Sequence, residues 1–165
     1  MQIEVYIKKI NESACIPSYA HENDSGMDVF ASEDVMIYPG QTVLVPTGIS
    51  LAIPEGYEVQ IRPRSGLSLH TMLRIPNSPG TIDAGFRDEI KVIVHNSSPE
   101  TRDDSESSLF LTSSKGNPKG TYLIRKGDRI AQMVCAKTER IRFIPVSTLD
   151  GIGTDRQGGF GSTGA

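Results

Sequence analysis

The sequence has few cysteines, no long apolar run and no block of charge of one sign, and each lack excludes a class of protein. Cys15 and Cys135 lie far apart without a nearby set of histidines, so neither a zinc site nor a disulfide scaffold is expected. No apolar stretch approaches the roughly 20 residues that a membrane-spanning helix needs. Glu4, Lys8 and Lys9 stand where a signal peptide would be apolar, so we expect a cytoplasmic protein without membrane attachment.

The chain length and the net charge exclude further classes of protein. The 165 residues are enough for one domain, and 37% hydrophobic residues can form its core. A formal net charge of -3 gives no general attraction to a polyanion such as DNA. We therefore expect no stable nucleic-acid binding, although a local cationic pocket for a small anion is still allowed.

Glycine and proline recur at short intervals, with 16 and 10 copies, and interrupt any long helical period. Apolar and polar residues alternate with period two in three segments, which is typical of strands with one buried face. These segments are 3–7, 49–53 and 57–61. Further strands are predicted at 35–37, 43–45, 90–94, 122–124, 130–134 and 141–146, and one short helix at 67–73. The pattern predicts an all-β sandwich or small barrel.

The tail from 158 to 164 reads Gly-Gly-Phe-Gly-Ser-Thr-Gly. Its glycines let backbone amides approach phosphate oxygens, and Ser162 and Thr163 add hydroxyl donors. Phe160 would find a stacking partner in a flat ligand such as a base, and Arg156 suits a phosphate. A P-loop is excluded because its lysine and following helix are missing. On composition alone, a frayed terminus is the alternative.

Two other segments carry candidate chemistry. In Arg62-Pro63-Arg64-Ser65-Gly66-Leu67, two arginines flank a stiff proline, which indicates either an anion pocket or a strand end with solvated arginines. In the segment 77–89, glycines bracket Asp83, which is either a water-activating base or a structural turn cap. Asp28 has the same ambiguity, with the water shell of a metal as its functional reading.

Taken in order, these segments resemble the five signature segments of the trimeric dUTP diphosphatases (dUTPases). The five segments are 25–31, 64–67, 77–86, 126–132 and 159–164. Only 97–120 lies clearly outside the resemblance.

The resemblance implies an all-β, jelly-roll-like distorted β-barrel that assembles as a homotrimer, with each active site built from three subunits. It implies a β domain at 1–146 with an inserted polar loop at 97–120, and a flexible arm at 147–165 that closes over the nucleotide. The implied reaction is hydrolysis of dUTP to dUMP and pyrophosphate with Mg²⁺. This reaction limits uracil in DNA and supplies dUMP for dTMP synthesis.

The resemblance also implies roles for individual residues. Asp83 would be the catalytic residue, which activates a water for attack on the α-phosphate, and Asp28 would hold the metal through water. Substrate contacts are implied for Arg64, Ser65 and Gly66 at the phosphates, for Asn77, Thr81, Ile82 and Asp83 at the uracil and sugar, for Phe86 under the deoxyribose, and for Lys91, Gln132, Arg156, Phe160, Gly161, Ser162 and Thr163 at the remaining positions.

Three positions depart from the family's usual pattern. Phe86 stands where many members have tyrosine, which keeps a ring under the sugar but removes a phenolic hydrogen bond. Asp88 replaces a frequent glycine and adds a carboxylate near Asp83 in the sequence. Arg156 precedes Phe160 by four residues, where a spacing of five is usual.

Two alternatives remain. A dCTP deaminase would share the fold and the trimer, but the position of its catalytic glutamate is Ile93 here. A nucleotide-loaded regulatory trimer could act on a protein partner through the loop 97–120, which carries the apolar island Leu109-Phe110-Leu111. The alternative for that loop is a plain exposed connection. Some phage members of the family have a similar lengthening, which suits a phage origin.

Overall fold

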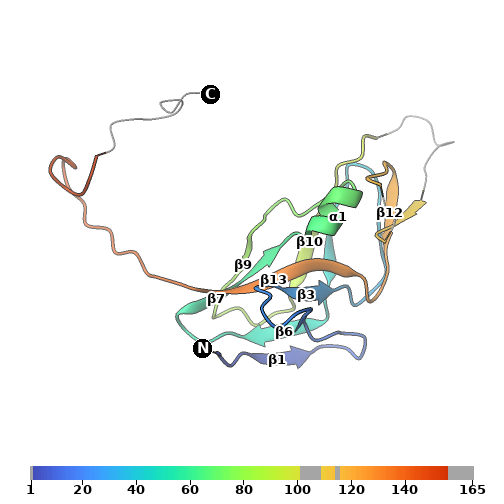
Figure 1. Cartoon of the computed structure of the whole chain (residues 1–165), viewed down its shortest axis with the longest axis horizontal. Helices are drawn as coiled ribbons and strands as arrows, with labels where there is room; N and C mark the ends of the chain where they lie inside the picture. The colour runs from blue at the N-terminus through green and yellow to red at the C-terminus, as the bar shows by residue number, and fades with distance from the viewer. Residues whose placement is uncertain (1, 101–108, 114–115, 156–165) are drawn as a thin grey trace.

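The computed structural model describes residues 2–100, 109–113 and 116–155, and four small sheets make up the body of this part of the chain (Figure 1). The strands are β1 (Tyr6–Lys9), β2 (Ser18–Tyr19), β3 (Met27–Phe30), β4 (Val35–Ile37), β5 (Thr42–Pro46), β6 (Ile49–Ala52), β7 (Tyr57–Arg62), β8 (Leu73–Arg74), β9 (Gly80–Ile82), β10 (Lys91–Asn96), β11 (Leu109–Leu111), β12 (Thr121–Ile124) and β13 (Arg129–Lys137). The one helix of the described residues is α1 (Ser65–His70). No helix there is long and apolar enough to cross a bilayer.

The largest sheet has the order β2-β3-β13-β7-β9, and all its pairs are antiparallel. The long strand β13 lies between β3 and β7, so it joins three of the predicted signature segments in one sheet. The other sheets are β1-β6, β5-β10-β8 and β11-β12-β4. The prediction of an all-β, jelly-roll-like fold is confirmed. In the described part of the chain none of the four sheets closes on itself, so the word barrel does not apply.

The core follows from the period-two alternation of the strands. Val59 and Ile61 of β7 are buried, as are Val92 and Val94 of β10, and their neighbours in sequence point to the opposite face. These residues belong to one hydrophobic cluster to which strands of every sheet contribute. Most predicted strands therefore appear where expected, whereas the predicted helix at 67–73 begins earlier, at Ser65, and ends at His70.

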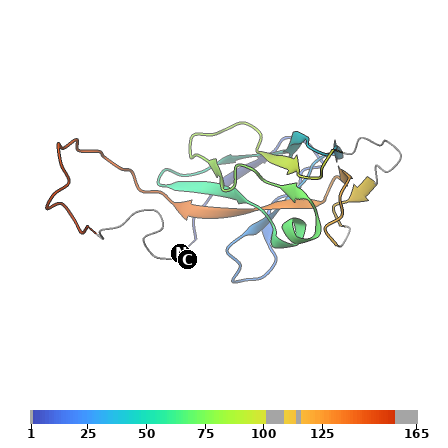
Figure 2. The same ribbon diagram turned by 90° about the horizontal axis from the view of Figure 1, so that it is seen from above.

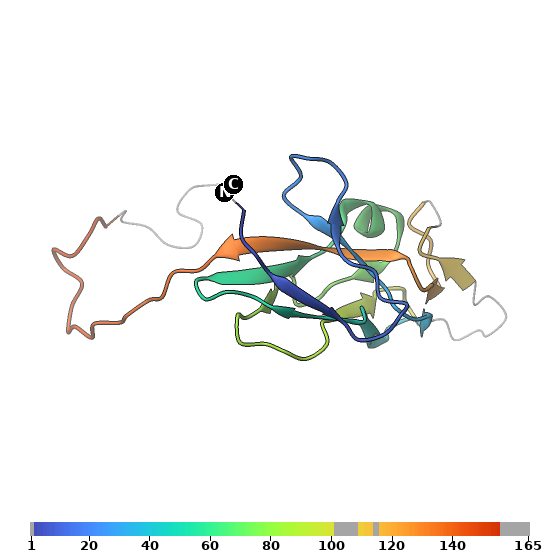
Figure 3. The ribbon, with the colours of Figure 1, turned by 90° about the horizontal axis from the view of Figure 1, so that it is seen from below.

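The predicted strand at 141–146 is wrong. Residues 138–155 contain no strand and lead away from the sheets in all three ribbon views (Figures 1, 2 and 3). Ile141, Phe143 and Ile144 are 77%, 83% and 74% exposed. A strand needs a hydrogen-bonding neighbour, and the described residues of this chain supply none here.

The loop 97–120 contains a strand that the sequence did not reveal. β11 pairs in parallel with β12, and the rings of Phe110 and Tyr122 have centroids 6.0 Å apart. Leu109 is 55% exposed, but Phe110 and Leu111 are half-buried against their own chain. The apolar island is thus largely a packing element, and a partner surface there would rest on Leu109 alone.

Candidate active site

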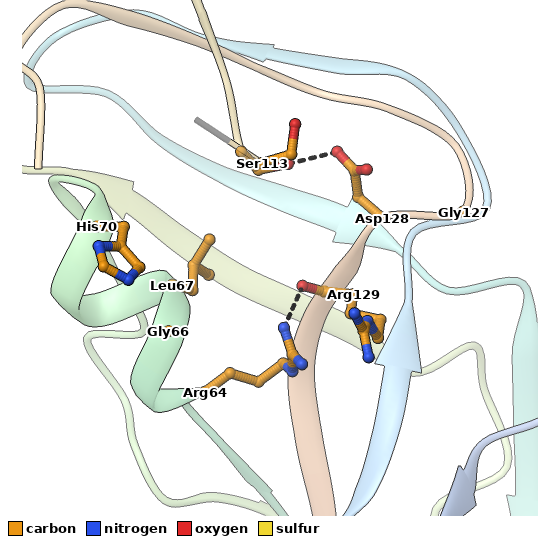
Figure 4. Close-up of a pocket in the computed structure, with 9 residues that line it drawn as sticks. Arg64, Gly66, Leu67, His70, Ser113, Gly127, Asp128 and Arg129 are labelled. Carbon is orange, nitrogen blue, oxygen red and sulfur yellow. Dashed lines mark hydrogen bonds between the residues drawn. The ribbon is translucent and has the colours of Figure 1, made fainter. Parts of the chain in front are cut away.

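Two arginines and an aspartate meet where β3, β7 and β13 come together. Arg64 follows the end of β7, and its Nε lies 2.8 Å from Asp28 Oδ1 on β3. Arg129, the first residue of β13, places a terminal nitrogen 3.3 Å from Asp28 Oδ2. Arg64 also donates to the backbone oxygen of Arg129 at 3.5 Å (Figure 4). One carboxylate is therefore shared by two guanidinium groups.

A pocket of about 410 Å³ opens beside these side chains. Its lining includes six residues that we call the arginine cluster, together with His21, Asp24 and Ser25. The arginine cluster consists of Asp28, Arg64, Ser65, Gly66, Arg129 and Gln132. Gln132 is held by a 2.9 Å hydrogen bond from its Nε2 to the Pro63 carbonyl. A Cβ at Gly26 would lie 2.5 Å from Gln132 Oε1, so a larger residue there would displace the Gln132 amide.

The arginine cluster has donors for an anion. Asp28 and Asp24 of the same pocket balance the two guanidinium charges, but the Arg64 and Arg129 side chains are 28% and 56% exposed and keep N–H groups that bond none of the described residues. A Cβ at Gly66 would meet no atom within 4 Å, so its backbone is open to a ligand. Guanidinium groups with free donors and an accessible backbone are what a phosphate group needs. The anion-pocket reading thereby gains support for Arg64 to Gly66, whereas Arg62 is exposed, bonds Gln60 and does not line the pocket, as in the reading of a solvated arginine.

A second group of predicted residues lies on β9 and the turns before and after it, which we call the β9 segment (77–86). Phe86 N donates to the Asp83 carbonyl at 3.0 Å, and the Arg87 guanidinium donates to the carbonyls of Ala84 at 2.5 Å and Phe86 at 2.8 Å. These bonds fix the turn that carries Asp83. The Asp83 carboxylate is exposed and has no hydrogen bond or ion pair among the described residues, so it is accessible to a ligand or water.

Asn77 lies at the start of the same β9 segment. A Cβ at Gly80 would lie 3.0 Å from Asn77 Nδ2, so the glycine lets the Asn77 amide fold over the strand. The Ser78–Pro79 peptide bond between them is cis. Thr81 is exposed and Ile82 half-buried in β9, and the Phe86 ring is 38% exposed. The predicted residues from 77 to 86 therefore lie together in the β9 segment.

The register of β9 on β7 places the β9 segment far from the arginine cluster along the sheet. Ile82 pairs with Val59 and Gly80 with Ile61, so Asp83 lies toward the start of β7, whereas Arg64 follows its end. The six steps from residue 58 to residue 64 span about 20 Å of extended chain at ~3.3 Å per residue. The pocket beside Asp83, about 260 Å³, is lined by residues such as Glu55, Glu58 and Arg140 and shares none with the arginine cluster.

Other predicted residues lie elsewhere. Lys91 Nζ is 3.4 Å from Glu89 Oε2 and lines neither pocket. The predictions for Arg156, Phe160, Gly161, Ser162 and Thr163 lie outside the described residues. Sequence reasoning missed Arg129 as a site residue. Its position inside the segment 126–132 could have indicated a role in the site. Its contact with Asp28, however, depends on the pairing of β13 with β3.

The surroundings of Asp28 fit a hydrated Mg²⁺. Each carboxylate oxygen accepts one arginine and retains a second lone-pair direction, which can accept a hydrogen bond from a metal-bound water. Among the described residues no group of three or more His, Cys, Asp or Glu is placed to hold a metal. Magnesium in proteins commonly keeps several waters and binds through one or two carboxylates together with substrate phosphates. A water-mediated role of Asp28 suits this chemistry.

The comparisons with known proteins agree on one family. The dUTPase family model matches residues 12–102. A deoxyuridine 5'-triphosphate nucleotidohydrolase of Clostridium kluyveri is 42% identical over 163 residues, which are 98% of this chain and 99% of the relative. The dUTPase of Staphylococcus bacteriophage 80alpha, solved with dUPNHPP, superposes with a TM-score of 0.87 at 29% identity, over 99% of this chain and 100% of that one. A mutant dUTPase from phage phi11 of S. aureus, described with a structural Mg(II) ion, gives a TM-score of 0.81 at 27% identity, over 88% and 98% of the two chains.

Proposed function

Since the chain belongs to the dUTPase family and is a nucleotidohydrolase, we propose that it hydrolyses dUTP to dUMP and pyrophosphate at sites shared between the subunits of a homotrimer. In a cell this reaction would limit uracil in DNA and supply dUMP for dTMP synthesis. The observation that carries the proposal is the position of two complementary half-sites at opposite ends of β7. One half-site has guanidinium donors for phosphates, and the other has an exposed carboxylate.

A single chain cannot apply both half-sites to one substrate. A base must lie within hydrogen-bond reach of the attacking water, and the water within ~3.5 Å of the phosphorus, whereas the half-sites are about 20 Å apart along β7. A head-to-tail contact between copies brings the arginine cluster of one against the β9 segment of the next, and such contacts form a closed ring when the rotation between copies closes. The trimer supplies a ring of three sites.

The chain beyond β13 also points to association. Six apolar side chains between residues 141 and 152 are more than half exposed: Ile141, Phe143, Ile144, Val146, Leu149 and Ile152. Leaving so many apolar side chains in water is unfavourable by about 1.5–3 kcal/mol for each large one that could be buried. A neighbouring copy of the chain would cover them and pair the extended backbone.

In the assembled site Asp83 orients a water molecule and accepts its proton as the water attacks the α-phosphorus. The fixed turn limits the movement of this carboxylate, and the absence of a competing partner among the described residues leaves it available. Asn77 and the backbone from 81 to 83 hydrogen-bond the uracil edge and sugar. Phe86, exposed at the same turn, packs under the deoxyribose and excludes a 2'-hydroxyl by its bulk.

The arginine cluster handles the charge of the triphosphate. Arg64, Ser65 and Gly66 bind phosphate oxygens, and Gln132 adds a contact from its fixed position beside Pro63. Mg²⁺, held by Asp28 through water, would offset the negative charge that the attacking water must pass. Preorganised donors of this kind stabilise the charge that develops in the transition state.

Three further roles rest on the family alone. The arm residues Arg156, Phe160, Gly161, Ser162 and Thr163 would close over the nucleotide, with Phe160 on the uracil and the others at the outer phosphates. Lys91 would contribute to the substrate site after leaving its partner Glu89.

The test is direct. Purified protein with Mg²⁺ is given dUTP or dCTP, and dUMP, pyrophosphate and ammonia are measured. We expect pyrophosphate from dUTP and no ammonia from dCTP, because the deaminase's glutamate position is the half-buried Ile93 on β10. Intact dUTP would contradict the proposal, and ammonia from dCTP would favour the deaminase.

A further inference from the structure

The returning half of the segment 97–120 is fastened to the body of the chain. Besides the pairing of β11 with β12, the backbone N of Asn117 donates to the His70 carbonyl at 2.7 Å. The buried Tyr122 hydroxyl donates to the Pro118 carbonyl and accepts the Met72 N–H at 3.0 Å. Burial raises the pKa of Tyr122, against the Met72 hydrogen bond, so its phenol stays a donor. The insert is thus held on both β12 and the end of α1.

At the end of β11 the insert reaches the turn that precedes β13. Thr112 Oγ1 donates to Asp128 Oδ2, and the same carboxylate oxygen accepts the Arg125 N–H at 2.8 Å. Gly127 in this turn has φ of 86°, in the left-handed region that favours glycine. Asp128 is therefore the point where the insert and the turn are joined.

The turn is also fixed from the other side. Gly127 N donates to the Ala31 carbonyl at 2.8 Å, and Ala31 N donates to the Asp128 carbonyl at 2.9 Å. Ala31 follows β3, the strand that carries Asp28. The turn 125–128 is clamped between β3 and Thr112, and neither contact involves a residue predicted to touch substrate.

The residue after this clamp belongs to the arginine cluster. Arg129 contacts Asp28 through its guanidinium and Arg64 through its backbone carbonyl. Thr112, Gly127 and Asp128 also line a pocket of about 400 Å³ whose far side is Arg64 and Arg129 (Figure 4). A shift of the turn would move both arginines.

From this chain of contacts we propose that Thr112 is a positioning residue for dUTP hydrolysis: its hydroxyl, through Asp128, fixes the turn that places Arg129 and Arg64. Through Thr112, the inserted segment then contributes to the geometry of the site and is not only an exposed connection. The inference rests on the proposed function, because it concerns the phosphate half of the same site.

The test compares Thr112→Val, which removes the hydroxyl at nearly constant shape, with Thr112→Ser, which keeps it. Affinities are measured by calorimetry for dUMP and for a non-hydrolysable dUTP analogue, with kcat and KM for dUTP. We expect Thr112→Val to weaken the analogue roughly threefold to thirtyfold more than dUMP, because only the longer ligand uses the whole arginine cluster. Thr112→Ser should restore the wild-type ratio.

A double-mutant cycle checks the route. If the hydroxyl acts through Asp128, Thr112→Val adds little to the loss caused by Asp128→Ala, whereas independent effects would multiply. Leu109→Ala, at the exposed start of β11, is the matched control and should keep wild-type affinities. The circular dichroism melting temperature and trimer mass of each variant exclude unfolding, and Thr112→Ala replaces the valine variant if that one fails to fold.

Either of two results would overturn the inference: a wild-type affinity ratio in Thr112→Val, or an equal loss in Thr112→Val and Thr112→Ser. Both differ from failure of the proposed function, in which the wild-type protein itself leaves dUTP intact.

Discussion

If the half-sites of different chains form each active site, two inactive variants should restore each other. Asp83→Asn removes the proposed base and leaves the arginine cluster intact, whereas Arg64→Ala removes a phosphate contact and leaves the β9 segment intact. We expect each homotrimer to lose about 10²–10³-fold or more in kcat. A mixed trimer places the intact Arg64 of one chain opposite the intact Asp83 of its neighbour.

The size of the recovery follows from the geometry of the ring. Every mixed trimer, whichever variant is in the majority, contains one interface with both groups intact, so about one site in three is active. Purification on the tags of both variants removes the homotrimers, so the expected activity is about one third of wild type. Against a background of about 1% or less from the homotrimers, the recovery is about thirtyfold or more.

The assay uses co-expression of the two variants with different affinity tags, followed by purification on both tags. Pyrophosphate release from dUTP is then compared between the mixed trimers and each homotrimer. Trimers of Asp83→Asn with two tags control for the tags and should stay inactive. Arg62→Ala is the matched arginine control, because Arg62 is bonded to Gln60 and lines neither pocket, and it should retain activity. Mixed trimers no more active than the homotrimers would refute sites shared between chains.

Three further predictions address single features. Asp83→Asn should lower kcat about 10²–10⁴-fold while dUTP-analogue binding by calorimetry stays close to wild type, and Asp88→Asn should change neither. Deletion of 156–165 should lower turnover by about 10²-fold or more with the trimer retained in light scattering; an unchanged rate would leave the arm without a role. Phe143→Ser, which alters a side chain 83% exposed in the single chain, should shift trimers toward monomers on dilution, whereas Tyr38→Ser, 55% exposed on the body, should not.

The sequence predicted the elements whose formation depends on local pattern. The alternation at 57–61 identified β7, because one buried face imposes period two wherever a strand lies on the core. The strand predicted at 141–146 is wrong. Its apolar residues need an apolar partner, and the described residues of the chain provide none.

The site was less accessible to sequence reasoning, because its contacts join distant segments. Asp28 and Arg64 were both candidates, but their ion pair spans 36 residues and depends on β3 and β7 flanking β13. Arg129 was overlooked for the same reason. Thr112 carried no signal at all, since it lies in a segment without counterpart in the family pattern, and only the docking of β11 brings it to Asp128.

In the proposed mechanism, the pairing of β9 with β7 makes association a requirement for catalysis. To bring Asp83 beside its own Arg64, the β9 segment would have to slide about six positions along β7, and each odd step would turn Ile82 and its neighbours to the wrong face of the sheet. Buried Val59 and Ile61 oppose any such slip, because they face the core at fixed positions. A flexible loop could not close this gap either, since the bonds from Phe86 and Arg87 fix the turn itself. If Asp83 is the base, as we propose, it therefore meets a bound phosphate only when a second chain presents its arginines.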